Sequence, residues 1–389
     1  MAHLRYLTAG ESHGPALTAI VDGLPAHLPL TAKQIDRDLV RRQGGYGRGG
    51  RMKIERDHAE LLAGVRWGET TGAPVTLQVV NRDWKNWGAK MSADPSDAGT
   101  LAPVTRPRPG HADLNGCLKY DQGDTRNVLE RASARETTMR VAVGAVGRQL
   151  LAQIGVEALV HVVDLGGVRA ELPADLPFDA LRDRAEASDV RCADEQAAAR
   201  MRAAIDGAKE AGDSLGGVVE ARIKGLPPGL GSFVQWDRKL TTRIAAAVMS
   251  IQAFKGVEIG LGFGCADLPG SQVHDEILWE EQRGYHRRTN RAGGFEGGMT
   301  TGEEVVVRGV MKPISTLYKP LASVDMATHA PYRASVERSD TCAVPAAGVI
   351  MEAVILFTLA DALLEKFGGD TITELQERHA AYLERVRRF

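Results

Sequence analysis

The sequence predicts a protein of mixed α and β structure in which two similar halves each supply strands and one long helix. The composition is that of a globular chain with a large core, since 43% of the 389 residues are hydrophobic and 25% are charged. An internal repeat links the two halves, and each half contains one long apolar helical pattern. We expect the two long helices to lie in the middle, with the sheets outside.

The internal repeat relates Gly10–Leu28 to Gly212–Leu230, which align without gaps. Both copies read G-x-S-x-G and then G-L-P-x-x-L, and further on residues 35–39 match residues 236–240. A chance match between common turn sequences is the alternative explanation. We interpret the repeat as a duplication about a pseudo-two-fold axis.

The chain contains no low-complexity tail and no linker rich in proline or serine, so we expect one domain spanning residues 1–389. The halves of the repeat would cover about residues 1–163 and 212–389. The stretch between them, about residues 164–211, has no counterpart in the repeat and is rich in Ala, Asp and Glu. It predicts an insertion of two surface helices.

The first half begins with a strand expected around Leu17–Val21. A helix is expected to begin at Thr31, because Thr31 and Gln34 form a capping box. This helix should end near Arg42, where a glycine-rich run follows.

A second helix is expected to begin at Ser133, where Ser133 and Glu136 form another capping box. Apolar residues then recur at helical spacing over residues 139–154. Gly144 and Gly147 lie within this pattern and would let another backbone approach the helix closely.

The segment Ala346–Phe367 is apolar on nearly every face and long enough to raise the question of a membrane span. Glu352 and Asp361 interrupt it, and the charged residues 365–366 close it. We therefore interpret it as a helix buried at the centre of a soluble protein.

Charge and cysteine content disfavour several classes of protein. The net charge is −2 and the pI is about 6.6, whereas a general nucleic-acid-binding protein is usually basic. The four cysteines form no C-x-x-C pair, so we expect free thiols in a reducing compartment. No apolar signal sequence and no metal-binding motif occurs. We expect a cytoplasmic protein without an intrinsic metal site.

Two histidines lie in loops flanked by glycine. Ser12 and His13 belong to the motif GESHG, and His111 belongs to RPRPGHAD, whose prolines fix the directions of its arginines, including Arg108. G-x-S-x-G is similar to the nucleophile elbow of hydrolases. Here it precedes the expected strand instead of following one, which disfavours an acyl-transfer serine.

The run Ser133-Ala134-Arg135 lies at an expected helix start, where N–H groups and the helix dipole attract anions. Plain capping by Ser133 is the alternative. Arg135 carries a positive charge in a first helical turn, against the dipole preference, which indicates the charge of a ligand nearby.

Further candidates lie in the second half. Asp340 follows Arg338 and Ser339 and either caps the last long helix or serves the site. Glycines at residues 293–298 would admit a planar ligand or a phosphate, and residues 312–316 (Lys-Pro-Ile-Ser-Thr) supply donors. The pattern is neither a P-loop nor G-x-G-x-x-G. Together the motifs predict a cationic pocket for a small ligand with several negative charges.

Several of these segments, in order along nearly the whole chain, resemble signatures of the chorismate synthase family. They are GESHG (10–14), RRQGGYGRGGRM (41–52), RPGHAD (108–113), ERASARET (130–137), GGFEGGM (293–299), MKPIST (311–316), ERSD (337–340) and PAAG (345–348). The resemblance implies an α+β fold, a β-α-β sandwich with central long helices between two antiparallel sheets, and a homotetramer.

The resemblance also implies an activity. The family converts 5-enolpyruvylshikimate 3-phosphate to chorismate by 1,4-anti elimination of phosphate, in the shikimate pathway to aromatic amino acids. It needs reduced FMN (FMNH2), although the reaction has no net redox change. The sequence contains no flavin-reductase motif, so an external reductant is expected, with NAD(P)H as a candidate.

The resemblance assigns roles to individual residues. His13 would protonate the departing phosphate, His111 would protonate or steady the reduced flavin, and Asp340 would act with flavin N5 to remove the C6 hydrogen. The residues implied to bind the substrate are Ser12, Arg42, Arg48, Arg51, Arg108 and Arg135. The residues implied to contact the flavin are Ser133, Ala134, Arg135, Gln252, Ala253, Gly298, Lys312, Pro313, Ile314, Ser315, Thr316 and Arg338. Arg42 and Arg48 would also lie near a nicotinamide nucleotide, and at Gln252 some members have Asn.

Two other functions fit parts of the pattern. A phosphate-ester hydrolase, or another anion-handling enzyme without flavin, would release phosphate in the absence of reduced FMN. An RNA-binding protein would use the arginine-rich run at residues 41–52 and bind RNA with a salt-dependent affinity. We expect a small-molecule ligand as the partner, and neither nucleic acid nor a membrane.

Overall fold

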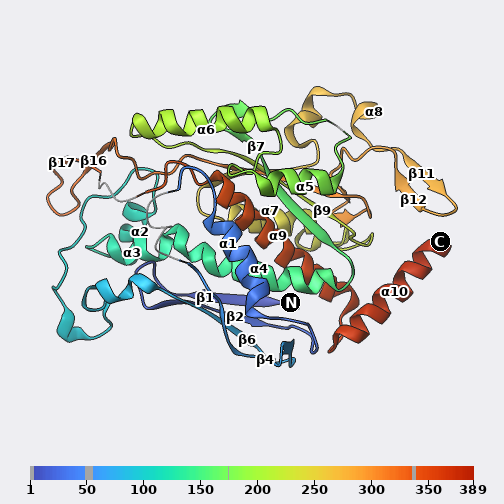
Figure 1. The fold of residues 1–389 in the computed structure, drawn as a ribbon, viewed down its shortest axis with the longest axis horizontal. Coiled ribbons are helices and arrows are strands. Elements are labelled where there is room, and N and C mark those ends of the chain that lie inside the picture. Colours follow the sequence, from blue (N-terminus) through green and yellow to red (C-terminus); the bar gives the residue numbers. More distant parts are fainter. Residues whose placement is uncertain (1–3, 49–55, 174, 335–338) are drawn as a thin grey trace.

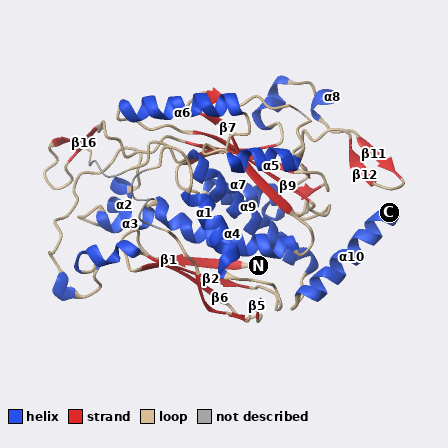
Figure 2. Ribbon diagram, in the orientation of Figure 1, coloured by secondary structure: helices blue, strands red, loops and turns tan. Residues whose placement is uncertain are grey.

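The computed structural model describes residues 4–48, 56–173, 175–334 and 339–389. Helices and antiparallel sheets share the fold, so the predicted α+β class is confirmed (Figures 1 and 2). The helices are α1 Ala32–Gln43, α2 Asp113–Tyr120, α3 Arg126–Ala132, α4 Thr137–Ala152, α5 Phe178–Ala187, α6 Glu195–Glu210, α7 Leu240–Met249, α8 Gly270–Val273, α9 Val344–Phe367 and α10 Ile372–Arg388.

A four-stranded antiparallel sheet has the order β1-β2-β6-β3. Its strands are β1 Arg5–Ala9, β2 Ala16–Asp22, β6 Val75–Val80 and β3 Glu60–Ala63. The strand expected around Leu17–Val21 is therefore confirmed as β2. Leu17, Ala19 and Val21 alternate with more exposed residues and are buried, so one face of the sheet packs on the core.

A five-stranded antiparallel sheet has the order β10-β15-β9-β7-β8. Its strands are β10 Phe254–Ile259, β15 Val305–Met311, β9 Gly217–Lys224, β7 Glu157–Leu165 and β8 Val168–Arg169. The short hairpins pair β4 Val65–Arg66 with β5 Glu69–Thr70, β11 Ile277–Glu280 with β12 Gly284–Arg287, β13 Phe295–Glu296 with β14 Met299–Thr300, and β16 Ala322–Val324 with β17 Pro331–Arg333.

Helices α4 and α9 cross in the middle, between the two sheets (Figure 1). Two glycines of α4 make their close approach possible, as expected. A Cβ atom built on Gly144 would lie 2.4 Å from Cβ of Ala353, and one on Gly147 would lie 3.0 Å from Cα of Phe357. Any larger residue at these positions would have to push the two helices apart.

Helix α9 is the core helix that the apolar segment predicted. By length and composition it could cross a membrane, but 94% of its most apolar stretch is buried inside this fold. It begins at Val344, with Pro345 in the first turn, and it ends before Gly368. The interpretation of residues 346–367 as a buried helix is confirmed.

Helix starts agree with the sequence at one place and differ at another. Helix α1 begins after Thr31, and the Gln34 side chain accepts a hydrogen bond from the Thr31 N–H at 2.7 Å, as the capping box predicted. The helix expected from Ser133 begins later, at Thr137. Ser133 caps a 3-10 turn instead, because its hydroxyl accepts from the Arg135 N–H at 3.2 Å.

Candidate active site

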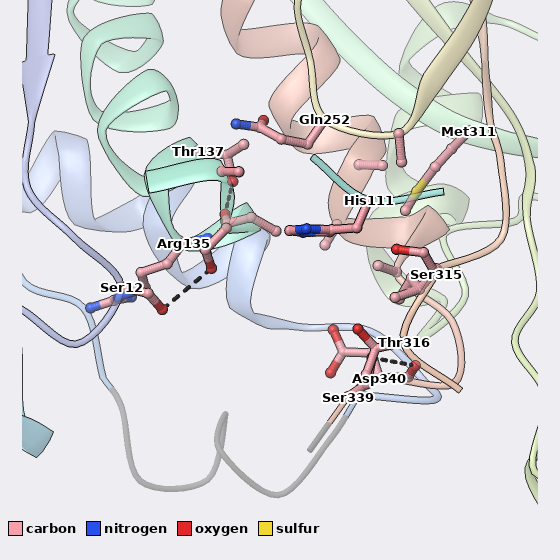
Figure 3. A pocket seen from close by; sticks show the side chains of 18 of the residues that line it. Ser12, His111, Arg135, Thr137, Gln252, Met311, Ser315, Thr316, Ser339 and Asp340 are labelled. Atoms are coloured by element: carbon pink, nitrogen blue, oxygen red, sulfur yellow. Dashed lines mark hydrogen bonds between the residues drawn. The ribbon is translucent and has the colours of Figure 1, made fainter. Parts of the chain in front are cut away.

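A cavity of about 860 Å³ opens at one end of the central helices. Figure 3 shows His111 and Ser315 on one side of it, Ser12 and Arg135 on the other, and Asp340 below them. In the described part of the chain, seven segments contribute lining residues: 12–13, 42–48, 108–112, 129–137, 251–253, 311–318 and 339–350. Loops far apart in the sequence meet here because the two long helices begin side by side.

His13 is held by a buried carboxylate and by an aromatic ring. Glu130 on α3 contacts Nδ1 of His13 at 2.9 and 3.0 Å and accepts from the His13 backbone N–H at 2.8 Å. Trp87 stacks on the imidazole with ring centroids 4.0 Å apart. Burial, the largest single influence, opposes ionisation of Glu130, but the hydrogen bonds and charge of His13, together with the charge of Arg126, hold the pKa of Glu130 below its ordinary value.

His111 and Arg108 share a second buried carboxylate, Asp113. Asp113 lies 2.5 Å from Nδ1 of His111 and accepts from Nε of Arg108 at 2.8 Å. Burial again opposes ionisation, but the bonds from His111 and Arg108 hold the pKa of Asp113 well below its ordinary value. Arg108 also donates to Oγ1 of Thr316 at 3.0 Å, which ties the RPGHAD loop to the segment after β15.

Arg135 and Arg42 converge on a third carboxylate, Asp57. Nη1 of Arg135 lies 2.7 Å from both carboxylate oxygens, and Arg135 also donates to the side-chain oxygen of Asn81. Nη1 of Arg42 lies 3.7 Å from Asp57, and its Nη2 donates to the carbonyl of Ala134 at 2.8 Å. The position of Arg135 in the sequence indicated a negatively charged ligand nearby. Asp57 of the protein itself supplies a negative charge there, so a ligand is not required to explain the position of Arg135.

Arg48 and Asp340 form an ion pair with Nη1 and Oδ2 2.7 Å apart. Their side chains are 12% and 21% exposed, so the pair lies in the wall of the cavity. The sequence predicted a substrate-binding arginine and a catalytic carboxylate as separate groups. The structure joins them.

The opposite wall carries donors from the segment after β15 and from the loop after α7. Lys312 donates to the carbonyl of Gly110, and burial together with the charge of Lys255 holds the pKa of Lys312 below its ordinary value. Gln252 donates to Glu136 at 3.1 Å, which fixes its amide. Ala253 has φ of 69°, a strained conformation for a residue with a side chain, and such strain is frequent at functional sites.

Most of the described residues predicted for the site line this cavity, and two do not. Arg51 and Arg338 lie outside the described residues. Pro313 and Gly298 are described but are not among the lining residues. Gly298 lies between β13 and β14, where its carbonyl accepts from the Leu240 N–H at 2.8 Å. Flavin contact by Gly298, Pro313 and Arg338, and substrate contact by Arg51, stay predictions, as do the ligand contacts of the lining residues.

Four residues without a predicted role support the site: Glu130, Asp113, Asp57 and Trp87. The first two lie within the motifs ERASARET and RPGHAD, so a search for carboxylates near the histidines and arginines could have found them. No local pattern marks Asp57 or Trp87, which reach the site only through the fold.

Fold and site together define an enzyme that acts on a small, multiply charged anion. Arg42, Arg48, Arg108, Arg135 and Lys312 line one cavity with two histidines, and Asp340 is the only carboxylate among the described lining residues. In the described part of the chain, no group of three or more His, Cys, Asp and Glu side chains is arranged to hold a metal ion.

Comparison with known proteins identifies the family. The family model of chorismate synthase matches residues 4–364. Proteins named chorismate synthase from Geobacter sulfurreducens and Brevibacillus brevis are each 59% identical, covering 99% and 98% of this chain and all of theirs. A solved structure titled "Crystal Structure of Chorismate Synthase" is 44% identical, covers 99% of both chains and superposes with a TM-score of 0.81.

The chain belongs to the chorismate synthase family. Its activity is that of the family, a carbon–oxygen lyase that eliminates phosphate from 5-enolpyruvylshikimate 3-phosphate to form chorismate in the shikimate pathway. The family requires a flavin.

Proposed function

We propose that this cavity binds 5-enolpyruvylshikimate 3-phosphate together with reduced FMN, and that its histidines and Asp340 serve the proton transfers of the elimination. The proposal rests mainly on the charge of the cavity. Five Arg and Lys side chains and two imidazoles line a space in which Asp340 is the one carboxylate among the described residues. The two carboxylates and the phosphate of the substrate complement this excess of positive charge.

The residues present fit a flavin. The cavity volume of about 860 Å³ lies within the range of about 300–1,000 Å³ typical of small-molecule sites. Ala346, Ala347 and Ile350 of α9 offer an apolar surface for a ring system. Lys312 and Thr316 offer donors for its phosphate. When bound, reduced FMN would supply electron density to the reaction.

The side chains of the protein would then have separate roles in the reaction. His13 would protonate the departing phosphate, and His111 would place a positive charge beside the reduced flavin. An anionic substrate would compete with Asp340 for Arg48, and Asp340 would then be available to take part in removing the C6 hydrogen. The ion pair between Arg48 and Asp340, with 2.7 Å between Nη1 and Oδ2, supports this proposal, because substrate binding to Arg48 would free Asp340 to act as a base.

An anaerobic assay of phosphate release tests the function. With 5-enolpyruvylshikimate 3-phosphate and chemically reduced FMN, we expect phosphate and chorismate in equal amounts. Phosphate release without reduced FMN would instead indicate a hydrolase.

Replacement of Arg48 tests the role of the arginines. Arg48→Ala should weaken substrate binding about tenfold to a hundredfold, because a charge-assisted hydrogen bond is worth about 1.5–3 kcal/mol. The dissociation constant from calorimetry with oxidised FMN present is the measurement. Arg37→Ala is the matched control on α1, since the Arg37 side chain is 63% exposed. Equal affinities of the Arg48 and Arg37 variants would contradict the assignment.

The wider assembly also belongs to the proposal. We expect a cytoplasmic homotetramer that receives electrons from an external reductant, with Arg42 and Arg48 near the nicotinamide nucleotide where NAD(P)H serves. Leu7 and Ile20, 78% and 45% exposed, face each other on the outer side of β1 and β2, which supports burial against another chain. Light scattering that shows a monomer at micromolar concentration would contradict the tetramer.

The strand order supports the proposed duplication. The order β1-β2-β6-β3 in the first sheet corresponds to β7-β9-β15-β10 in the second, and α1 and α7 follow β2 and β9. On this correspondence α4 is equivalent to α9. The inserted helices α5 and α6 then fall between the first two strands of the second half, and β7 belongs to that half. Equivalent loops of both halves meet at the cavity.

A further inference from the structure

The imidazole of His13 has little freedom to rotate. Both carboxylate oxygens of Glu130 contact its Nδ1, at 2.9 and 3.0 Å, and one of them also accepts from the His13 backbone N–H. Trp87 stacks on the ring at 29° between planes. The carboxylate fixes which nitrogen faces α3, and the indole fixes the plane of the ring.

Glu130 is itself held in the ionised form. Its side chain is 1% exposed, and Nη1 of Arg126 donates to it at 3.0 Å. The contacts with His13 and Arg126 hold the pKa of Glu130 below its ordinary value in spite of burial. An ionised carboxylate only accepts hydrogen bonds, so Nδ1 of His13 must carry a proton.

We infer that Glu130 is a positioning residue which holds His13 in the Nδ1-protonated form, with Trp87 setting the ring plane, so that Nε2 is the atom that exchanges a proton in the cavity. The inference rests on the proposed role of His13 as an acid. It adds that Nε2 is the acidic atom and that Glu130 and Trp87 select it. A carboxylate in this position also stabilises the imidazolium, as the buried aspartate of a serine-protease triad does.

The variant Glu130→Gln tests this assignment in two independent ways. In ¹⁵N spectra of histidine-labelled protein, the neutral His13 ring should be the Nδ1–H tautomer in the wild type and a mixture of tautomers in the variant, because a glutamine amide can also donate to Nδ1. Turnover should fall at least about tenfold, since loss of an orienting carboxylate costs up to about 10⁴ in the triad. The KM for the substrate should change little.

Two controls separate positioning from a structural role. Glu220→Gln removes another buried glutamate that contacts a histidine, His161, at 3.1 Å on the five-stranded sheet outside the cavity, and turnover should be retained. Arg126→Met removes the other partner of Glu130 and should leave the His13 tautomer unchanged. If Glu130→Gln does not fold, Glu130→Asp serves, because its shorter side chain cannot span both N–H groups of His13.

The outcomes distinguish this inference from the role of His13. An unchanged tautomer with turnover within twofold of the wild type in Glu130→Gln would overturn the positioning role, whatever His13→Ala shows. An altered tautomer combined with a fully active His13→Ala variant would leave Glu130 as the positioning residue and remove His13 as the acid.

Discussion

Replacing either His13 or His111 with Ala, or both in a double variant, should cost on the order of tenfold to ten-thousandfold in turnover, because a positioned proton transfer typically contributes about 10²–10⁴-fold. Substrate binding should suffer much less, because the arginines around the cavity supply most of the charge complementarity. Anaerobic turnover at saturating substrate and reduced FMN, together with the substrate dissociation constant, measures both effects. Each histidine is fixed by its own buried carboxylate, Glu130 or Asp113, so neither should replace the other.

A control histidine completes this test. His58→Ala is the matched control, because the His58 side chain is 62% exposed and pairs with Asp36 outside the cavity. Near-wild-type turnover in the double variant would rule out acid catalysis by these histidines.

The variant Glu352→Gln should destabilise the fold by about 3–5 kcal/mol, because removing one partner of a buried ion pair leaves the others uncompensated. Glu352 lies in the middle of α9 with a fully buried side chain. Its Oε2 lies 2.6 Å from Nη1 of Arg41 and 2.7 Å from Nη2 of Arg148, and Asp38 contacts both arginines. Urea unfolding followed by circular dichroism measures the loss.

Glu365→Gln on the same helix is the matched control. The Glu365 side chain is 44% exposed and pairs with Arg243, so its loss should cost at most about 1 kcal/mol. Equal stabilities of the two variants would show that the buried network contributes nothing beyond a surface pair.

The same network predicts a pH effect. Burial opposes ionisation of Glu352, but Arg148 and Arg41 hold its pKa well below the ordinary value of 4.5. A lowered native pKa means that the ionised form adds stability above the unfolded value, and that this stability is lost as the pH falls through the native value. The wild type should therefore lose more stability than Glu352→Gln between neutral pH and strongly acidic pH.

The sequence by itself determined the features that depend on local pattern. The strand expected around Leu17–Val21 is β2, the capping box at Thr31 located the start of α1, and continuous apolarity located α9, because each signal lies within one element. The motifs around His13, His111 and Asp340 identified the family, since such segments carry the site chemistry in an ordered series. The repeat predicts two similar halves, and the duplication stays a proposal.

Only the tertiary structure decided how the charges pair. Arg48 meets Asp340, and Arg135 meets Asp57, across long stretches of sequence, and no period or spacing encodes such contacts. Just before α4, the side chain of Arg42, from another helix, likewise binds the carbonyl of Ala134 within the 3-10 turn that Ser133 caps. Local sequence patterns determine where each helix or strand lies. A buried charged group, in contrast, is stable only beside a partner, and only the assembled fold brings that partner to it.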